Sequence, residues 1–197
     1  MTGPRQQRHQ TNFVAHGMID MDFAAFMAAS GFGDCLRYWL RLPRTDGVPE
    51  KRQLDPAQMP RHILPWLVLY QRMPNGRYLC RLMGTGACAM WGEDPTWRYV
   101  DEILPPAAYA ARRAPFDECL DQGRPLGFQA RLVMRGREWK TYRRLMLPLR
   151  CGAVVDHVFS MVSALKVAEA GRMQAPPTLD GPETIVRPTD RDLAPWS

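Results

Sequence analysis

The chain has 197 residues, of which 46% are hydrophobic and 23% charged, enough for one domain core with residues left over for terminal extensions. Its formal net charge of +6 comes from 26 Lys and Arg against 20 Asp and Glu, and these basic residues are scattered instead of clustered, which argues against a nucleic-acid-binding face. No apolar run approaches the roughly 18 residues of a membrane span, and the polar N-terminus carries no secretion signal, so a soluble protein is expected.

The N-terminal third predicts a polar arm and two helices. Residues 1–18 lack any apolar periodicity and are expected to be flexible. The Ala, Met and Phe content of residues 20–30 predicts a short helix, which the sequence "GFGD" ends. Asp34 is a candidate N-cap for the following segment, "CLRYWLRL", whose apolar residues share one side of an amphipathic helix.

The middle of the chain predicts a β-hairpin. The segment "LDPAQMPRHILPWL" holds three prolines and cannot form one continuous helix. The strand-like run "WLVLYQRM" follows it, then the turn signal Pro74-Asn75-Gly76, then the strand-like run "RYLCRLMG". Two short strands joined by such a turn lie side by side and antiparallel.

The C-terminal half predicts helices, then strands, then a tail. Short helical candidates follow Gly86, and the longest helix covers "AAYAARRAPFDECLDQG", with Pro115 expected to disturb its middle. Two strand-like runs lie on either side of a turn at residues 135–137, and "AVVDHVFSMVSAL" supplies a final strand. Residues 168–197 are rich in proline and charge and are expected to form a flexible tail.

The spacing Gly84-x-Gly86-x-x-Ala89 is a permitted variant of the dinucleotide-binding fingerprint. That fingerprint requires parallel strands joined by crossover helices. Here the preceding strand is the second arm of the predicted hairpin, and the later strands follow one another through short turns. The sequence therefore favours a simpler interpretation, in which both glycines let the chain turn sharply from strand into helix.

The cysteines and histidines indicate no metal site. An odd number of cysteines, five in all, with no Cys-x-x-Cys pair fits a reducing cytoplasm. The four histidines are far apart, although His157 could reach a cofactor from the last strand if it is not simply a satisfied or surface residue. No Ser-His-Asp arrangement and no paired carboxylates can be identified, and Cys88 lacks the setting of a photoreactive cysteine.

Five segments in order resemble a bacterial family of stand-alone PAS (Per-Arnt-Sim) domains. They are "LRYWLRLP", "LDPAQMPRHILPWLVLY", "GRYLCRLMGTGACAMWGED", "VDEILPP" and "WKTYRRLMLPL", and the resemblance covers about Leu36 to Leu165. It implies an α+β fold: a five-stranded antiparallel PAS-like sheet with helices packed on one face, plus the N-terminal helical extension. It also implies three regions, namely an arm and short helix over 1–33, the PAS-like domain over 34–167 and the flexible tail over 168–197.

One position departs from the family pattern. Trp97 stands where these proteins usually have glycine, and a tryptophan cannot adopt a positive φ without strain. The loop before the second short helix is therefore expected to differ.

The resemblance further implies a small cavity between the sheet and its helices. The candidate ligand-binding residues are Arg81, Thr85, Met90, Trp91, Phe116, Tyr142, Phe159 and Met161, with Leu82 as a further cavity candidate. Three of them, Arg81, Thr85 and Tyr142, would supply polar contacts. Ordinary core packing is the simpler role for the apolar members, and a solvated strand position is the simpler role for Arg81.

The function that the resemblance implies is a non-catalytic sensory domain in the cytoplasm. It would bind an unidentified small molecule or a signalling partner protein and relay a conformational change. A homodimer through the helix at 20–30 is expected, and the sequence does not identify a cofactor. The alternatives are a small-molecule enzyme that uses the same cavity and a binder of nucleic acid or anionic surfaces.

Overall fold

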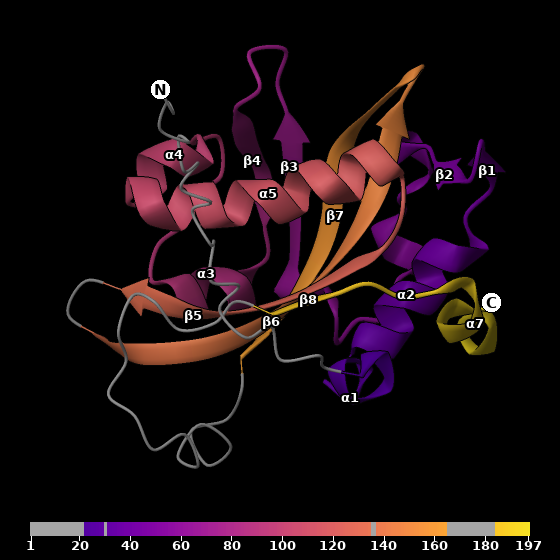
Figure 1. Ribbon diagram of the computed structural model, residues 1–197, viewed down its shortest axis with the longest axis horizontal. Helices are drawn as coiled ribbons and strands as arrows, with labels where there is room; N and C mark the ends of the chain where they lie inside the picture. The colour runs from indigo at the N-terminus through magenta and orange to yellow at the C-terminus, as the bar shows by residue number, and fades with distance from the viewer. Residues whose placement is uncertain (1–21, 30, 135–136, 165–183) are drawn as a thin grey trace, which may run out of the picture.

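The structure, a computed structural model, describes residues 22–29, 31–134, 137–164 and 184–197. One sheet has the strand order β4-β3-β7-β6-β5-β8, and β1 pairs with β2 in a second, small sheet (Figure 1). The strands are β1 Arg44–Thr45, β2 Val48–Pro49, β3 Leu67–Arg72, β4 Tyr78–Met83, β5 Leu126–Met134, β6 Arg137–Cys151, β7 Val154–Ala164 and β8 Thr184–Val186. The α-helices are α1 Phe23–Met27, α2 Phe32–Arg41, α3 Thr85–Trp91, α4 Val100–Ile103, α5 Pro106–Gln122 and α7 Asp190–Leu193. The 3-10 helices are η1 Lys51–Gln53, η2 Pro56–Gln58, η3 Leu64–Trp66 and η4 Ala194–Trp196.

Every pair of neighbouring strands in the large sheet is antiparallel, which confirms the predicted hairpin and excludes a dinucleotide-binding crossover. The β3–β4 turn closes through hydrogen bonds from Met73 N to Arg77 O and from Gly76 N to Met73 O, each 2.8 Å long. The turn residues therefore set the register of the first two strands.

Gly84 joins β4 to α3 at a point where two backbone segments nearly touch. Its N–H donates to the carbonyl of Leu67 over 2.8 Å, and a Cβ added to it would lie 2.5 Å from the Pro65 carbonyl oxygen and 2.6 Å from that of Leu64. Its φ is −66°, so the position needs glycine for the close approach and not for a left-handed turn. The apparent fingerprint thus reflects packing of α3 against η3.

Helices cover both faces of the sheet because alternate residues of each strand point to opposite sides. Val68 and Tyr70 pack with α3, α4 and α5 in one core, whereas Leu67 packs with α1 and α2 in the other. Figure 1 shows α5 crossing one face of the strands while α1 and α2 lie away from it. The predicted α+β fold is confirmed, with the N-terminal helical extension forming the layer on the second face.

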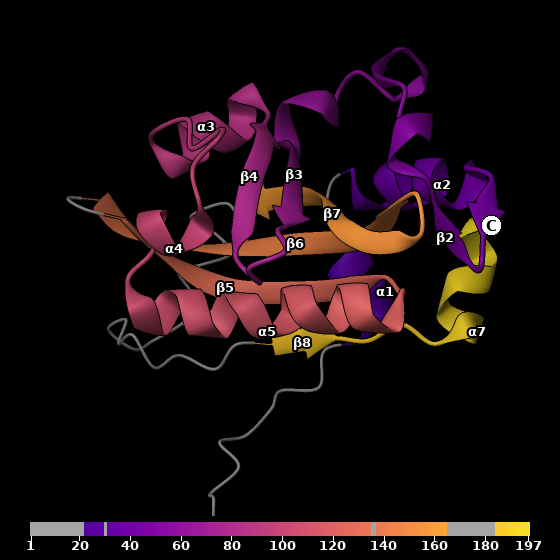
Figure 2. The same cartoon turned by 90° about the horizontal axis from the view of Figure 1, so that it is seen from above.

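The sheet has a sixth strand, which corrects the expectation of five. Residues 184–197, expected to belong to a flexible tail, form β8, α7 and η4. β8 pairs with β5, and its Thr184 and Val186 are buried. Three residues are too few for an alternating pattern to predict a strand. They form one because they pair with the free edge of the sheet at β5. Figure 2 shows the chain continuing from β8 to α7, beside α2.

Two local expectations about helices are also corrected. Pro115 lies inside α5 without ending it, because the residue is buried and packing compensates for the missing N–H. α2 begins at Phe32, with Gly31 in the cap position at a φ of 84°, so Asp34 lies in the first turn. The expectations for residues 1–18 and 168–183 fall outside the described residues. Within the described ranges, no helix is both long and apolar enough to cross a bilayer.

Candidate functional site

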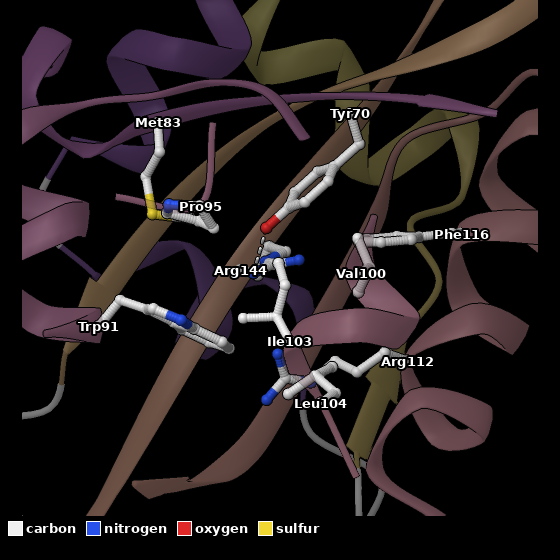
Figure 3. A pocket seen from close by; sticks show the side chains of 10 residues that line it. All are labelled: Tyr70, Met83, Trp91, Pro95, Val100, Ile103, Leu104, Arg112, Phe116 and Arg144. Atoms are coloured by element: carbon white, nitrogen blue, oxygen red, sulfur yellow. Dashed lines mark hydrogen bonds between the residues drawn. The ribbon is translucent and has the colours of Figure 1, made fainter. Parts of the chain in front are cut away.

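A pocket lies between the sheet and the helices α3, α4 and α5 (Figure 3). Its lining is mostly apolar but includes two arginines and a tyrosine: Tyr70, Met83, Trp91, Pro95, Val100, Ile103, Leu104, Arg112, Phe116 and Arg144. The free volume of the pocket is about 10 Å³, which is room for about one water molecule. A larger ligand therefore requires the lining side chains to move apart.

Arg144 enters this pocket from β6. Its side chain is 3% exposed, and its Nη2 donates to the hydroxyl of Tyr70 over 3.2 Å. Its guanidinium carbon lies 5.1 Å from the Tyr70 ring centroid and 5.4 Å from that of Phe116. Strand alternation sends the neighbouring Arg143 to the other face, where it donates to Gln129.

Arg112 enters the pocket from α5. It is 6% exposed, and its guanidinium carbon lies 5.9 Å from the Trp91 ring centroid and 5.8 Å from that of Phe128. The sequence alone does not single out Arg112, because Arg112-Arg113 resembles an ordinary pair of surface charges. Arg112 lies four residues before Phe116, so the two share one face of the helix, and this spacing could have indicated that Arg112 is buried.

The charged and polar groups of the pocket are suited to holding a ligand. The pocket lining, within the described residues, contains no Asp, Glu, His, Ser or Cys. Arginine remains charged at any physiological pH and donates without exchanging its proton. The pocket can therefore orient a ligand by hydrogen bonds and charge, and cover it with apolar side chains.

The sequence-predicted site residues divide among three places. Trp91 and Phe116 line the pocket, and Met90 lies in the core beside it at 8% exposure. Phe159 and Met161 lie in the opposite core with α1 and α2, which excludes them from this pocket. Both residues were assigned to the cavity because the sequence does not reveal the second helical layer, which covers the other face of β7.

The remaining candidates are not brought into the pocket. Thr85 is exposed at the start of α3, and Leu82 is 50% exposed on β4. Arg81 stacks on Trp97, with its guanidinium carbon 4.4 Å from the ring centroid. The side chain of Tyr142 lies outside the described residues.

Trp97 has the left-handed conformation usually reserved for glycine. Its φ is 70°, its N–H donates to Cys80 O over 2.7 Å, and its side chain is 63% exposed. The loop thus holds a tryptophan in the left-handed conformation at the cost of strain. Whether it differs from the loops of the family stays a prediction.

Because strain dominates at this exposed position, we expect Trp97→Gly to be more stable than Trp97→Ala by about 1 kcal/mol. Both variants lose the stacking on Arg81, so their difference isolates the backbone effect. Urea unfolding measures it, and equal midpoints would show that no strain is stored there.

His157 lies outside the pocket, on the face that packs against α2. It is 2% exposed, its Nδ1 lies 2.6 Å from Asp156 Oδ1, and its buried Nε2 has no hydrogen-bond partner within the described residues. Burial lowers the pKa of His157 below its ordinary value of 6.5, and the nearby Asp156 carboxylate opposes this only in part.

Because His157 is buried, we expect the free energy of unfolding to fall in mild acid. The unfolded chain takes up a proton on His157 below about pH 6.5, whereas the folded chain does so only at lower pH. The free energy of unfolding should therefore fall as pH drops from about 6.5 toward the folded-state pKa, by at most about 1.4 kcal/mol per pH unit. Urea midpoints of wild type and His157→Gln measured between pH 7 and about pH 5.5 check this. A variant whose midpoint falls as much as that of wild type would contradict it.

A wider groove of about 470 Å³ lies beside α2, lined in part by Asp34, Arg37 and Arg41. It is open to solvent, and Asp34 already pairs with Arg37 and, over 2.9 Å, with His62. Ion pairs that are exposed to water contribute little binding energy, so this groove is a weaker candidate site than the buried pocket.

The described residues also contain no group of three or more His, Cys, Asp or Glu side chains placed to hold a metal ion.

An antiparallel sheet with short helices, one longer helix and a small interior pocket defines a class of α+β domains. A family model described as "PAS domain" matches residues 27–161, and the chain belongs to this family. Such domains are sensory signalling domains. The sequence has no match among curated proteins.

Two solved structures show a distant similarity to this chain. One, described as an RNA-binding Light-Oxygen-Voltage receptor, is 16% identical with a TM-score of 0.35, and the match covers 54% of this chain and 33% of that one. The other, a Rhodobacter sphaeroides LOV protein, is 18% identical with a TM-score of 0.43, and the match covers 58% of this chain and 66% of that one.

Proposed function

We propose that this PAS domain is a non-catalytic sensor that binds a small molecule in the pocket under α4 and α5 and relays the change to a partner protein. The observation that carries the proposal is the placement of two buried arginines, Arg112 and Arg144, in a pocket whose other lining residues, apart from Tyr70, are apolar. Burying charged groups is costly, and ordinary cores avoid it. Two buried arginines lining one small pocket are unusual for a core built only for packing.

The relay would begin at α5, which lines the pocket and also holds the C-terminal segment. Two residues after the pocket-lining Phe116, Glu118 accepts a hydrogen bond from Arg187 over 2.7 Å. Near the end of the helix, Arg124 pairs with Asp190 over 2.6 Å. A shift of α5 on ligand binding would pull on residues 184–197 through both ion pairs.

The C-terminal segment would carry the shift to α2. Trp196 lies against Gly33, where an added Cβ would be 2.5 Å from the indole ring. The guanidinium carbon of Arg37 lies 5.2 Å from the Trp196 ring centroid. Residues 184–197 thus contact both helical layers, and a partner protein that binds α2 or this segment would sense the pocket.

The proposal places the protein in the cytoplasm, where its five free cysteines would stay reduced, and retains the homodimer expected from the sequence. Native mass spectrometry of the freshly purified protein tests it, because the spectra report bound small molecules and the number of subunits together. We expect a small molecule bound to the wild type.

A pocket-filling substitution provides the control. Ile103→Trp adds bulk to the lining, whereas Val154→Trp adds the same side chain at a position that is 58% exposed. The bound mass should disappear in the first variant and persist in the second. A bare polypeptide in the wild type, or a bound mass that Ile103→Trp leaves unchanged, would overturn the proposal.

A further inference from the structure

We propose that the groove beside α2 is the docking site for an acidic segment of the partner protein. This inference rests on the proposed function, because it names the chemistry of the partner that receives the signal. The groove has a volume of about 470 Å³, which is within the range of binding sites in proteins. One of its sides is a face of α2 on which Asp34, Arg37 and Arg41 follow one another at helical spacing.

Positive charge without a nearby counter-charge gathers at this groove. Arg41 lines it, and the exposed residues Arg52 and Arg61 each adjoin a lining residue along the chain. None of these three arginines forms an ion pair with a carboxylate among the described residues. Arginines in the rest of the described chain commonly do, as at Arg72, Arg77, Arg98, Arg113, Arg124 and Arg187. A negatively charged partner would therefore complement the groove.

The carboxylate that lines the groove is already paired. Asp34 accepts a hydrogen bond from Arg37 over 2.5 Å, and its other oxygen lies 2.9 Å from His62 Nε2. Arg41 is thus the lining cation that is left for a partner. A nucleic acid carries a charge at every phosphate and would bring one close to Asp34, whereas a peptide can place a neutral residue there. The groove therefore suits an acidic peptide better than a nucleic acid.

Apolar side chains also line the groove. Tyr38 and Leu42 contribute from α2 and its end, and Pro60 contributes from the segment after η2. A segment that covers these side chains removes apolar surface from water. Exposed ion pairs each add little energy, but a bound segment forms several of them together with this apolar contact. The expected partner segment thus combines acidic residues with apolar ones.

Arg37 connects the groove to the C-terminal segment that would carry the signal. Its guanidinium carbon lies 5.2 Å from the ring centroid of Trp196, which packs against Gly33 of α2. Figure 2 shows α7, the helix before η4, beside α2. A shift of residues 184–197 would move Arg37 and with it one side of the groove. Docking of the partner would then respond to the distant pocket.

A matched set of labelled peptides tests the charge and the apolar contact. Fluorescence anisotropy would measure binding of the full chain to peptides of about 12 residues that repeat Glu-Glu-Leu, Gln-Gln-Leu or Glu-Glu-Ser. We expect the first peptide to bind at least about tenfold more tightly than either of the others. Its affinity should also fall when NaCl is raised from about 50 to about 300 mM, because salt screens exposed charges.

Three variants locate the binding. Arg41→Gln and Arg61→Gln should each weaken binding of the Glu-Glu-Leu peptide about threefold or more. Arg98→Gln should leave it unchanged, since Arg98 lies between α3 and α4, where it pairs with Glu93 over 3.1 Å. Each variant removes one positive charge, so a general attraction between the protein and an acidic peptide would weaken equally in all three.

The outcomes separate this inference from the function on which it rests. Failure of the Glu-Glu-Leu peptide to bind, or an equal loss of affinity in all three variants, would overturn the docking site. Tighter binding of a single-stranded DNA of similar length would overturn it in favour of a nucleic-acid partner. The bound mass in native spectra judges the sensor proposal independently, so a bare polypeptide that binds the peptide in the groove would keep the docking site and remove the sensor.

Discussion

Replacement of Gly84 by alanine should destabilise the fold by about 3 kcal/mol, the upper part of the usual range for overpacking. The added Cβ would meet the carbonyl oxygens of Leu64 and Pro65 at 2.6 and 2.5 Å, and backbone atoms cannot rotate away as a side chain can. Chemical unfolding of the variant measures the loss. The loss should not depend on any added nucleotide, because the glycine serves the contact between α3 and η3.

Gly86→Ala is the matched control within the same motif. Its Cβ would lie 3.1 Å from the Pro65 carbonyl oxygen, and an alanine within α3 gains helix propensity. We expect a change within about 1 kcal/mol of the wild type. If both substitutions were equally mild, the close approach of the backbone would not be what requires glycine at position 84.

Phe116→Ala should lower the free energy of unfolding by about 3–5 kcal/mol. Phe116 is 2% exposed, and its ring centroid lies 4.9 Å from that of Tyr70 and 5.0 Å from that of Tyr78. Truncation removes these ring contacts and leaves a cavity that joins the pocket. Chemical unfolding gives the stability loss, and native mass spectrometry shows whether the bound small molecule is lost as well.

Phe26→Ala separates the two effects. Phe26 is fully buried in the opposite core, where its ring centroid lies 5.1 Å from that of Phe32. Its truncation should cost a similar free energy and leave the bound molecule in place. Loss of the molecule from both variants would mean that retention follows overall stability and not the lining of the pocket.

The sequence predicted the elements whose signals are local. The turn at Pro74-Asn75-Gly76 defined the hairpin, and the ordered motifs indicated the PAS domain, which the match over residues 27–161 confirms. Trp91 and Phe116 were candidates because the family resemblance implies a cavity between the sheet and its helices, and both line the pocket. Phe159 and Met161, also named as cavity candidates, instead pack in the second helical layer with α1 and α2.

Features set by long-range contacts could not be predicted in this way. β8 is a strand because β5 offers it an edge, about 60 residues away along the chain, and its three residues carry no pattern of their own. Arg112 and Arg144 have the composition of surface residues, and only the fold shows that they share a pocket. Charged residues of this kind run against the usual rule for cores, and functional sites are where such rules are expected to fail.

A crystal structure of the freshly purified protein, without added ligand, tests the central claim most directly. We predict electron density for a small molecule between Trp91, Arg112 and Arg144, with α4 displaced from the sheet to make room. Density for a bound molecule in the groove beside α2 instead, or a pocket closed by its own side chains with no molecule bound, would contradict the account.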